Sequence, residues 1–576
     1  MIFKPQFISD SKIPLPEYPR PQFKRDSYIN LNGEWDYAIS NSSDFLLEFD
    51  GKILVPYSPE SELSTVNRQL QKDEFLHYRK IFNISNDFNI GRVLLNIGAC
   101  DQVTEIFVNK KFVKRFEGGY YNINADITEY LSGENNELYI IVTDDASSWV
   151  YGRGKQKYKR GGIWYTATSG IWQTVWLESV PVDYIKGVKY YPNFDEKSLL
   201  VVVDAIKEVK VTVLDGENVI GEGVTNDYKV TLDVSSCKPW SPDCPELYTV
   251  ILESGEDRVE SYFGLRKFSV IEKNGIKLTA LNNEPIFHNG LLDQGYFHDG
   301  HYTPKDNFAL YSDVKSVKDL GFNMLRKHIK VEPHLWYYYC DVLGILIHQD
   351  FINGGGEYPF IRIALAPFFN LHINDKNYKK MKRPQSSRVH YFKEMDYLMD
   401  QLHNTVSLCL WTPFNECWGQ FDAKDVYYKV KEKDDTRLID HASGWQDKGV
   451  GDLYSRHIYF RKIKVKNDKK RVLALTEFGG YSYLLENHIF TNKKFGYKIY
   501  KSKEKLEKGY KNLFEKEIIP LIINEGLCVS VYTQLTDVED EINGIFTYDR
   551  VLKIDENLIK SINEKIYLAF NQLINS

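Results

Sequence analysis

Two glutamates, Glu416 and Glu477, each follow a short apolar segment, Leu408–Trp411 and Val472–Leu475 respectively. Burying a carboxylate without a partner is costly, so this placement at the end of a buried strand calls for a reason. Two carboxylates that share a site can act as a nucleophile and as a general acid/base. For either glutamate alone the alternative is an ion pair, such as Glu477 with Arg326, but for the two together we favour catalysis.

Further polar residues end neighbouring apolar segments. They are Arg326 and His328 after residues 323–325, Asp350 after residues 345–347, Asn415 beside Glu416, and His457 and Tyr459 at the end of residues 455–459. Because the carboxyl ends of parallel barrel strands meet at one face, we expect these side chains to surround the two glutamates.

Strand and helix patterns alternate after residue 268, as is typical of a parallel sheet covered by helices. Apolar spacing predicts helices over residues 306–320 and 332–343, which end at Gly321 and Gly344. Strands are predicted at residues 323–326, 345–348, 406–411, 455–459, 472–475 and 528–532. The alternation predicts a C-terminal (β/α)8 TIM barrel over residues 271–576.

Residues 1–180 contain short alternating runs separated by Gly, Asn and Asp, which predicts a β-sandwich. A hairpin turn is predicted at Asn109, since asparagine tolerates positive φ. Residues 181–270 continue with short strands and a Pro-rich segment at 238–245, which suits an immunoglobulin-like β-sandwich. The fold class expected is therefore multidomain, α/β plus all-β.

The chain resembles glycoside hydrolase family 2, the group that contains β-galactosidases and β-glucuronidases, over essentially its whole length. The resemblance is carried by RPQFKRDSYINLNGEWD at residues 20–36, SGIWQTVWLE at 169–178, WSPDCPELYT at 240–249, NTVSLCLWTPFNE at 404–416 and LTEFGG at 475–480. It implies a jelly-roll sugar-binding domain, an immunoglobulin-like domain and a catalytic barrel, which agrees with the reading of the strands and helices.

The resemblance also implies roles for five residues. Glu477 would be the nucleophile and Glu416 the acid/base of a double displacement with retention, which requires carboxyl groups about 5–5.5 Å apart. Asn415 would bind the sugar 2-hydroxyl, Tyr459 would donate a hydrogen bond to the nucleophile, and Arg326 would keep it charged.

The sequence departs from the family pattern at two places. His328 stands one residue closer to Arg326 than the family histidine does, so its substrate-binding role is left open. The last strand lacks the expected tryptophan, and Gln534 or Asp537 can face the sugar instead. The acidic cluster at residues 537–541 is otherwise interpreted as a solvated loop. Asp144, in the first sandwich, either touches the sugar or lies in a surface turn.

The sugar is the hardest question. Family glucuronidases usually carry Asn-x-Lys before a Gly-Ile-Phe-Thr-like segment, but here Gly544–Thr547 follows Glu541-Ile-Asn543 without the lysine. Lys327, Lys330 or the segment 153–155 would have to supply the cation that a uronate needs. A terminal β-galactoside is the first choice and a β-galacturonide or β-glucuronide the alternative. A non-catalytic carbohydrate-binding protein on a hydrolase fold is the alternative from another class.

Composition excludes several other classes. The 73 basic and 79 acidic residues give a net charge of −6, which argues against nucleic acid as a partner. The chain contains neither an apolar run long enough to span a membrane nor the apolar core of a signal peptide. Seven scattered cysteines argue against a disulfide framework, so the expected location is the cytoplasm. A homo-oligomer is left open.

No cofactor is expected. His441, His457 and His488 form the best histidine group for a metal, but they lack the spacing of a helical metal site. The metal ligands are therefore unassigned, and a structural Mg or Na ion is left open.

Overall fold

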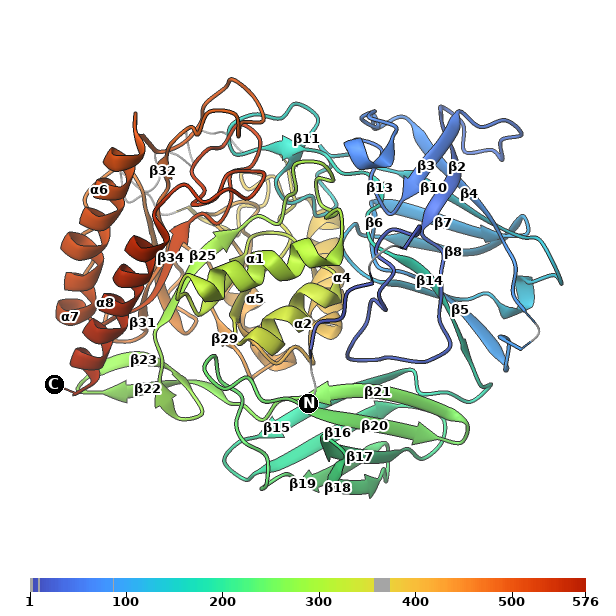
Figure 1. The fold of residues 1–576 in the computed structure, drawn as a ribbon, viewed down its shortest axis with the longest axis horizontal. Coiled ribbons are helices and arrows are strands. Elements are labelled where there is room, and N and C mark those ends of the chain that lie inside the picture. Colours follow the sequence, from blue (N-terminus) through green and yellow to red (C-terminus); the bar gives the residue numbers. More distant parts are fainter. Residues whose placement is uncertain (1–3, 9–10, 86, 357–372, 576) are drawn as a thin grey trace.

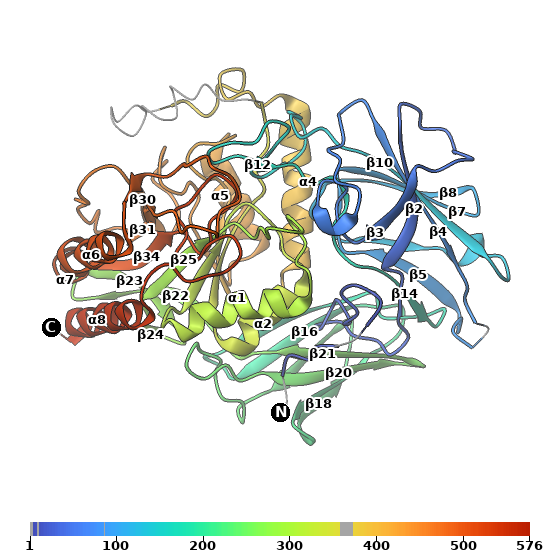
Figure 2. The same cartoon turned by 45° about the horizontal axis from the view of Figure 1, so that its top comes forward.

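The computed structural model describes residues 4–8, 11–85, 87–356 and 373–575. Three bodies of secondary structure lie side by side (Figures 1 and 2): a large β-sandwich, a smaller one, and a barrel surrounded by helices. The all-β N-terminal region and the parallel C-terminal barrel confirm the predicted fold class.

The first sandwich consists of antiparallel sheets with buried inner faces. One sheet has the order β3-β2-β4-β10-β7-β8, with β2 Gly33–Ser40, β3 Gly51–Val55, β4 Phe75–Phe82, β7 Val103–Val108, β8 Lys111–Glu117 and β10 Asn136–Thr143. The other has the order β1-β14-β5-β9, with β1 Ile29–Asn30, β5 Arg92–Ile97, β9 Ile123–Asp126 and β14 Val175–Val180. The turn between β7 and β8 has φ 50° at Asn109 and 65° at Lys110, which confirms the predicted hairpin.

Two short strand pairs complete this sandwich. They are β6 Cys100–Asp101 with β13 Gly170–Ile171, and β11 Gln156–Lys157 with β12 Tyr165–Thr166. Figure 1 shows β11 between the first sandwich and the barrel, and Figure 2 shows β12 beside the barrel. This sandwich therefore extends loops toward the part of the barrel where the predicted site lies.

The smaller sandwich has its own core, formed by side chains such as Val201, Val211 and Val250, all fully buried. One sheet contains β15 Gly187–Asn193, β16 Ser198–Asp204 and β19 Lys229–Asp233. The other has the order β18-β17-β20-β21, with β17 Lys210–Asp215, β18 Asn218–Val224, β20 Tyr248–Ser254 and β21 Asp257–Phe263. Strands β16 and β17 alternate buried residues with more exposed ones, as a half-buried sheet requires.

Eight parallel strands form the barrel in the order β29-β28-β27-β26-β25-β34-β31-β30. They are β25 His288–Asp293, β26 Met324–Lys327, β27 Leu346–Asp350, β28 Leu408–Thr412, β29 Leu438–Ile439, β30 Leu453–Ile458, β31 Val472–Gly479 and β34 Leu527–Thr533. The amide of Asp452 donates to the carbonyl of Ile439 at 2.9 Å, which joins the two end strands and nearly closes the barrel. Before it, β22 Phe268–Lys273, β23 Ile276–Leu281 and β24 Glu284–Pro285 form a small antiparallel sheet.

Helices surround the barrel. They are α1 Asn307–Asp319, α2 His334–Leu343, α4 Gln385–Gln401, α5 Ala423–Lys433, α6 Lys503–Leu513, α7 Ile519–Glu525 and α8 Glu556–Asn575, with the π-helix η3 Phe514–Ile518 between α6 and α7. Asp306 caps α1 by accepting from the Ala309 amide, and Gly344 ends α2 with φ 70°. Residues 440–452 and 459–471, all described, connect their strands without a helix, so the barrel is less regular than predicted.

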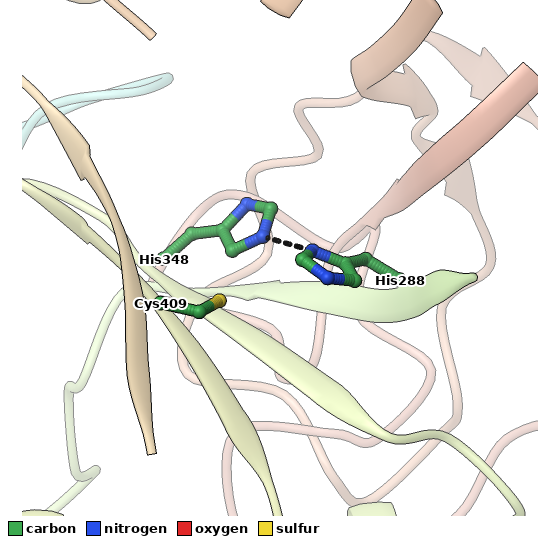
Figure 3. Close-up of side chains that lie close together, drawn as sticks. All are labelled: His288, His348 and Cys409. Atoms are coloured by element: carbon green, nitrogen blue, oxygen red, sulfur yellow. Dashed lines mark hydrogen bonds between the residues drawn. The ribbon is translucent and has the colours of Figure 1, made fainter. Parts of the chain in front are cut away.

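A buried polar group of the barrel lies apart from the predicted site. Figure 3 shows His288 of β25 and His348 of β27 directed toward one another, with Cys409 of β28 beside them. His288 Nδ1 lies 2.9 Å from His348 Nε2. Burial lowers the pKa of His288 to about 3 and that of His348 well below its usual value, so both rings are neutral and hydrogen-bonded.

Candidate active site

The segment after β28 places Glu416 at the mouth of the barrel. The amide of Glu416 donates to the carbonyl of Ser443 at 2.9 Å, which fastens this loop to the connection between β29 and β30. Glu416 and Cys417 adopt the left-handed backbone, with φ 47° and 66°, which a non-glycine residue reaches only under constraint. The tertiary contact therefore fixes the direction of the Glu416 side chain.

Glu477 lies within β31 beside a β-bulge. The pairing of β30 with β31 shifts between Arg456 and His457, so that Thr476 is an extra residue in β31. The Glu477 carboxylate receives hydrogen bonds from Arg326 Nη1 at 3.1 Å and from the Tyr459 hydroxyl. A guanidinium and a phenol thus both donate to this buried carboxylate.

The two carboxylates face one another across His457. The Nδ1 atom of His457 lies 2.8 Å from Glu416 Oε1 and 3.4 Å from Glu477 Oε2. One oxygen of each carboxylate and this ring nitrogen all lie within 4.8 Å of one another. The two carboxyl groups are therefore close enough to act on one bound molecule.

The electrostatics differ between the members of the site. Burial raises the pKa of Glu416, against the opposing charges of Lys155 and Arg326. Burial also lowers the pKa of His457 to about 3, so its ring is neutral. The Thr476 hydroxyl, itself an acceptor from Ser443, donates to Nε2, which leaves the Nδ1 proton for Glu416.

Arg326 links most of the predicted site residues. Its guanidinium donates to both oxygens of Asp350 at 3.0 Å and to Asn415 Oδ1 at 2.8 Å. Asp350 in turn lies 2.6 Å from Nδ1 of His328. Because Arg326 occupies the amide oxygen of Asn415, the amide nitrogen is the part that remains to donate to a ligand.

Loops of the first sandwich form one wall of the pocket. The pocket is lined by Arg153, Gly154, Lys155, Ile163 and Trp164 from the sandwich, and by Ile329, Asn353, Gly354, Asn415 and Trp418 from the barrel. Trp164 meets Trp418 edge to face at 5.2 Å, and Trp418 Nε1 donates to Glu416 Oε2 at 3.3 Å. Sequence reasoning did not single out these two tryptophans, since only the fold brings them together.

Two predicted site residues take part in other contacts. Asp144 is buried inside the first sandwich, where it accepts from the Ser169 hydroxyl at 2.8 Å. Gln534 is fully buried next to the barrel mouth, accepting from Gln294 at 2.9 Å and donating to Asn543 at 2.7 Å. In the described structure, neither residue contacts the carboxylate pair.

The expectation of a solvated acidic loop at residues 537–541 is wrong, because all four acidic side chains are buried. Asp537 pairs with Lys553 at 2.7 Å, and Asp540 pairs with Arg160 at 2.9 Å. Glu541 accepts from the Tyr165 hydroxyl and from Asn543. Partners distant in sequence compensate the charges, which a local run of acidic residues does not reveal.

The three candidate cations differ in their surroundings. Lys327 pairs with Asp293 at 2.5 Å and Glu332 at 2.8 Å, and Lys330 donates to Glu332 at 2.9 Å, so both are engaged inside the protein. Lys155 lines the pocket, and within the part of the chain that the structure describes no hydrogen bond or ion pair holds its ammonium group.

Two groups of described side chains have the spacing of metal ligands. One is Glu416, His457 and Glu477, and the other is His288, His348 and Cys409 of Figure 3. The thiol of Cys409 donates to a backbone carbonyl, and burial raises its pKa, so the thiolate that a metal prefers is disfavoured. The three histidines that the sequence offered, His441, His457 and His488, form neither of these groups: His441 lies near Asp447, and His488 pairs with Asp549 at 2.7 Å.

Comparison with known proteins identifies the family. The model of the TIM barrel domain of glycosyl hydrolases family 2 matches residues 275–567, and a second glycosyl hydrolases family 2 model matches residues 184–266. The chain therefore belongs to glycosyl hydrolases family 2, as the sequence motifs predicted.

Curated relatives carry two kinds of name. A putative beta-glucuronidase of Formosa agariphila is 25% identical over 358 residues, covering 58% of this chain and 42% of the relative. A beta-galactosidase of Thermoanaerobacter pseudethanolicus is 22% identical over 497 residues, covering 81% of this chain and 62% of the relative. The chain thus spans about half the length of the curated relatives it matches.

Solved structures share the fold over nearly the whole chain. The beta-glucuronidase of an uncultured Clostridium superposes with a TM-score of 0.75 and 17% identity, covering 93% of this chain and 98% of that structure. A beta-galacturonidase of Eisenbergiella tayi bound to galacturonate gives a TM-score of 0.71 and 16% identity, covering 95% of this chain and 98% of that structure.

Among the described residues of this chain, no helix is long and apolar enough to cross a bilayer.

Proposed function

We propose that the protein is a retaining exo-β-glycosidase that acts by double displacement through Glu477 and Glu416. The observation that carries the proposal is the pair of facing carboxylates, with oxygens within 4.8 Å. They have different surroundings: Arg326 and Tyr459 donate to Glu477, whereas burial raises the pKa of Glu416. This division suits Glu477 to the role of nucleophile and Glu416 to the role of acid in one site.

In the first step a Glu477 oxygen attacks the anomeric carbon while the bond from that carbon to the leaving oxygen breaks. Glu416 gives its proton to the leaving oxygen, and a glycosyl ester on Glu477 results. The Asn415 amide is positioned beside Glu416 to donate to the sugar 2-hydroxyl, a contact that strengthens as positive charge develops on the ring.

In the second step Glu416, now ionised, takes a proton from water while the water oxygen attacks the anomeric carbon. The ester bond to Glu477 breaks, and the sugar leaves with its original anomeric configuration. His457 keeps Glu416 in place throughout, because its neutral ring donates from Nδ1.

A terminal β-galactoside is the substrate we propose first, supported by the beta-galactosidases among the relatives and by the missing Asn-x-Lys lysine. A β-hexuronide is the second candidate. It is favoured by Lys155, which lines the pocket and whose ammonium group has no ion pair among the described residues, and by the names of the structural neighbours.

Hydrolysis of a panel of 4-nitrophenyl β-glycosides tests the proposal. The panel contains the galactoside, glucoside, glucuronide, galacturonide, mannoside, xyloside and fucoside. We expect turnover of the galactoside, and loss of at least about 10³-fold in kcat for Glu477→Gln, because the amide cannot form the glycosyl ester. Proton NMR of the first-formed sugar is expected to show the β-anomer.

The matched control is Glu539→Gln, since Glu539 is a buried carboxylate that pairs with Arg160 away from the catalytic pair. It is expected to keep wild-type activity. A folded Glu477→Gln variant with undiminished turnover, or formation of the α-anomer, would contradict the proposed mechanism. Binding of sugar without turnover of any glycoside would support the non-catalytic alternative.

A further inference from the structure

Tyr459 donates to Glu477, and a second tyrosine packs on its ring. The ring of Tyr497 lies parallel to that of Tyr459, with centroids 3.8 Å apart and an angle of 7° between the planes. A parallel contact this close covers one face of the Tyr459 ring, so that ring cannot turn about its Cβ–Cγ bond without meeting Tyr497. The proposed mechanism gives Tyr497 no role.

Tyr497 is fixed to the segment that directly follows Glu477. Its amide donates to the Gly480 carbonyl at 3.3 Å. Gly480 has φ 63°, and a Cβ atom added there would lie 2.3 Å from Cδ2 of the Tyr497 ring, so only glycine leaves room for that ring. Tyr497 also precedes β33 Lys498–Ile499, which pairs with β32 Tyr481–Ser482. The position of the Tyr497 ring is therefore tied to the strand that carries Glu477.

The hydroxyl end of Tyr459 has two contacts of its own. It donates to Glu477 and lies 3.1 Å from Oγ1 of Thr533, the last residue of β34. A phenol has one proton to donate, so with that proton given to Glu477 the Thr533 hydroxyl is the donor of the second contact. Tyr459 also lines a cavity of about 230 Å³ with Gly479 and Tyr481, so free space adjoins this residue. Its two hydroxyl contacts fix one atom, and the plane of the ring requires a further contact.

We propose that Tyr497 is a positioning residue, which acts through Tyr459 to keep the phenol hydroxyl on the carboxylate of Glu477. The inference rests on the proposed function, because it assigns a task in the reaction of Glu477. A misplacement of about 1 Å near reacting atoms can cost about 10²-fold in rate. Among the described residues no hydrogen bond joins Tyr497 to Glu477 or Glu416, so its effect on the reaction has to pass through Tyr459.

A double-variant cycle tests the path through Tyr459. The kcat and KM values of the wild type, Tyr497→Leu, Tyr459→Phe and the Tyr459→Phe/Tyr497→Leu double variant are measured on the 4-nitrophenyl glycoside that the wild type turns over fastest. We expect Tyr497→Leu to lower kcat about 10-fold or more and to change KM less than about 3-fold. In the Tyr459→Phe background the same substitution is expected to lower kcat less than about 2-fold further, because the hydroxyl that Tyr497 positions is absent.

Two further variants separate the stacked ring from other causes. Tyr497→Phe retains the ring and is expected to stay within about 3-fold of the wild-type kcat. Tyr428→Leu, at an exposed tyrosine of α5, is the matched control and is expected to keep wild-type activity. Equal losses for Tyr497→Phe and Tyr497→Leu, or losses that add in full in the double variant, would overturn the inference. An unchanged kcat in a folded Tyr497→Leu variant would overturn it as well. If Tyr497→Leu does not fold, Tyr497→Met takes its place, because its longer side chain fills more of the same space.

A structural measurement keeps this inference separate from the proposed function. Crystal structures of Tyr497→Leu and Tyr497→Phe are compared at the Tyr459 hydroxyl. We expect that hydroxyl to lie beyond about 3.5 Å from the Glu477 carboxylate in Tyr497→Leu and to keep its hydrogen bond in Tyr497→Phe. This pattern, without turnover of any glycoside by the wild type, would uphold the positioning of Tyr459 and reject the glycosidase. Turnover by the wild type, with the contact retained in Tyr497→Leu, would do the reverse.

Discussion

At the scale of single residues, the site works by giving two glutamates opposite surroundings. Glu477 has a guanidinium and a phenol as hydrogen-bond donors, whereas Glu416 has a neutral imidazole and an indole. Neutral donors compensate a buried charge less than a guanidinium does, so Glu416 keeps its proton more readily. We therefore expect single substitutions in this pocket to change the pKa of Glu416.

Lys155→Met is expected to move the alkaline limb of the pH profile upward. Glu416 must carry a proton in the first step, so kcat/KM falls as pH rises through its pKa. Lys155 lowers that pKa, and its removal therefore raises the pKa and extends activity to higher pH. The pH dependence of kcat/KM checks this, with Lys111→Met as the control, because Lys111 is an exposed residue at the start of β8 in the same sandwich. A limb that stays in place or moves to lower pH would contradict it.

At the scale of secondary structure, the sequence predicts the elements well and their irregularities poorly. Apolar spacing and the closing glycine placed α2 within two residues of its observed bounds, because both signals are local. The β-bulge at Thr476, which precedes Glu477, has no such signal, since it depends on pairing with β30. The burial of Glu541 depends likewise on Tyr165 and Asn543, one of which lies in another body of the fold.

The same limit applies to the candidate site. Strand ends indicated Arg326, Asp350, Asn415, His457 and Tyr459, and the structure brings them into one hydrogen-bonded network around the carboxylates. From the sequence, Lys155 was one of several candidate cations for a uronate. The structure distinguishes it, because Lys327 and Lys330 form ion pairs inside the protein. Composition and spacing thus identify the residues at the strand ends. The balance of charges in the pocket can be predicted only once the fold is known.

Gly344→Ala is expected to destabilise the protein where α2 ends against the Pro-rich segment of the smaller sandwich. Gly344 has φ 70°, and an added Cβ would lie 2.3 Å from the Pro242 carbonyl oxygen. Gly275→Ala is the control, because Gly275 has φ 72° but an open surrounding. Left-handed strain alone costs about 1 kcal/mol, so thermal unfolding should show a clearly larger loss at Gly344. Equal losses for the two variants would contradict the close contact.

At the scale of the whole molecule, the pocket belongs to two bodies of the fold. We propose that the chain divides into domains at residues 1–180, 181–270 and 271–576, in keeping with the separate sheets. The first of these supplies Lys155 and Trp164 to a pocket that Asn415 and Trp418 of the barrel also line. The sandwich would then take part in substrate recognition, and a change there should alter the catalytic step without touching a barrel residue.

Trp164→Ala tests that dependence. Trp164 packs on Trp418, whose indole donates to Glu416, so its loss should leave the general acid less well positioned. General acid assistance matters most for poor leaving groups. We therefore expect kcat/KM to fall about 10-fold or more for a methyl β-glycoside and less than about 3-fold for the 2,4-dinitrophenyl β-glycoside of the same sugar. Phe112→Ala, an exposed aromatic on the distant hairpin of the same sandwich, should change neither value. Equal losses of kcat/KM for both leaving groups would assign Trp164 to sugar binding alone. Unchanged kcat/KM values for both would show that Trp164 of the first sandwich does not affect the catalytic step.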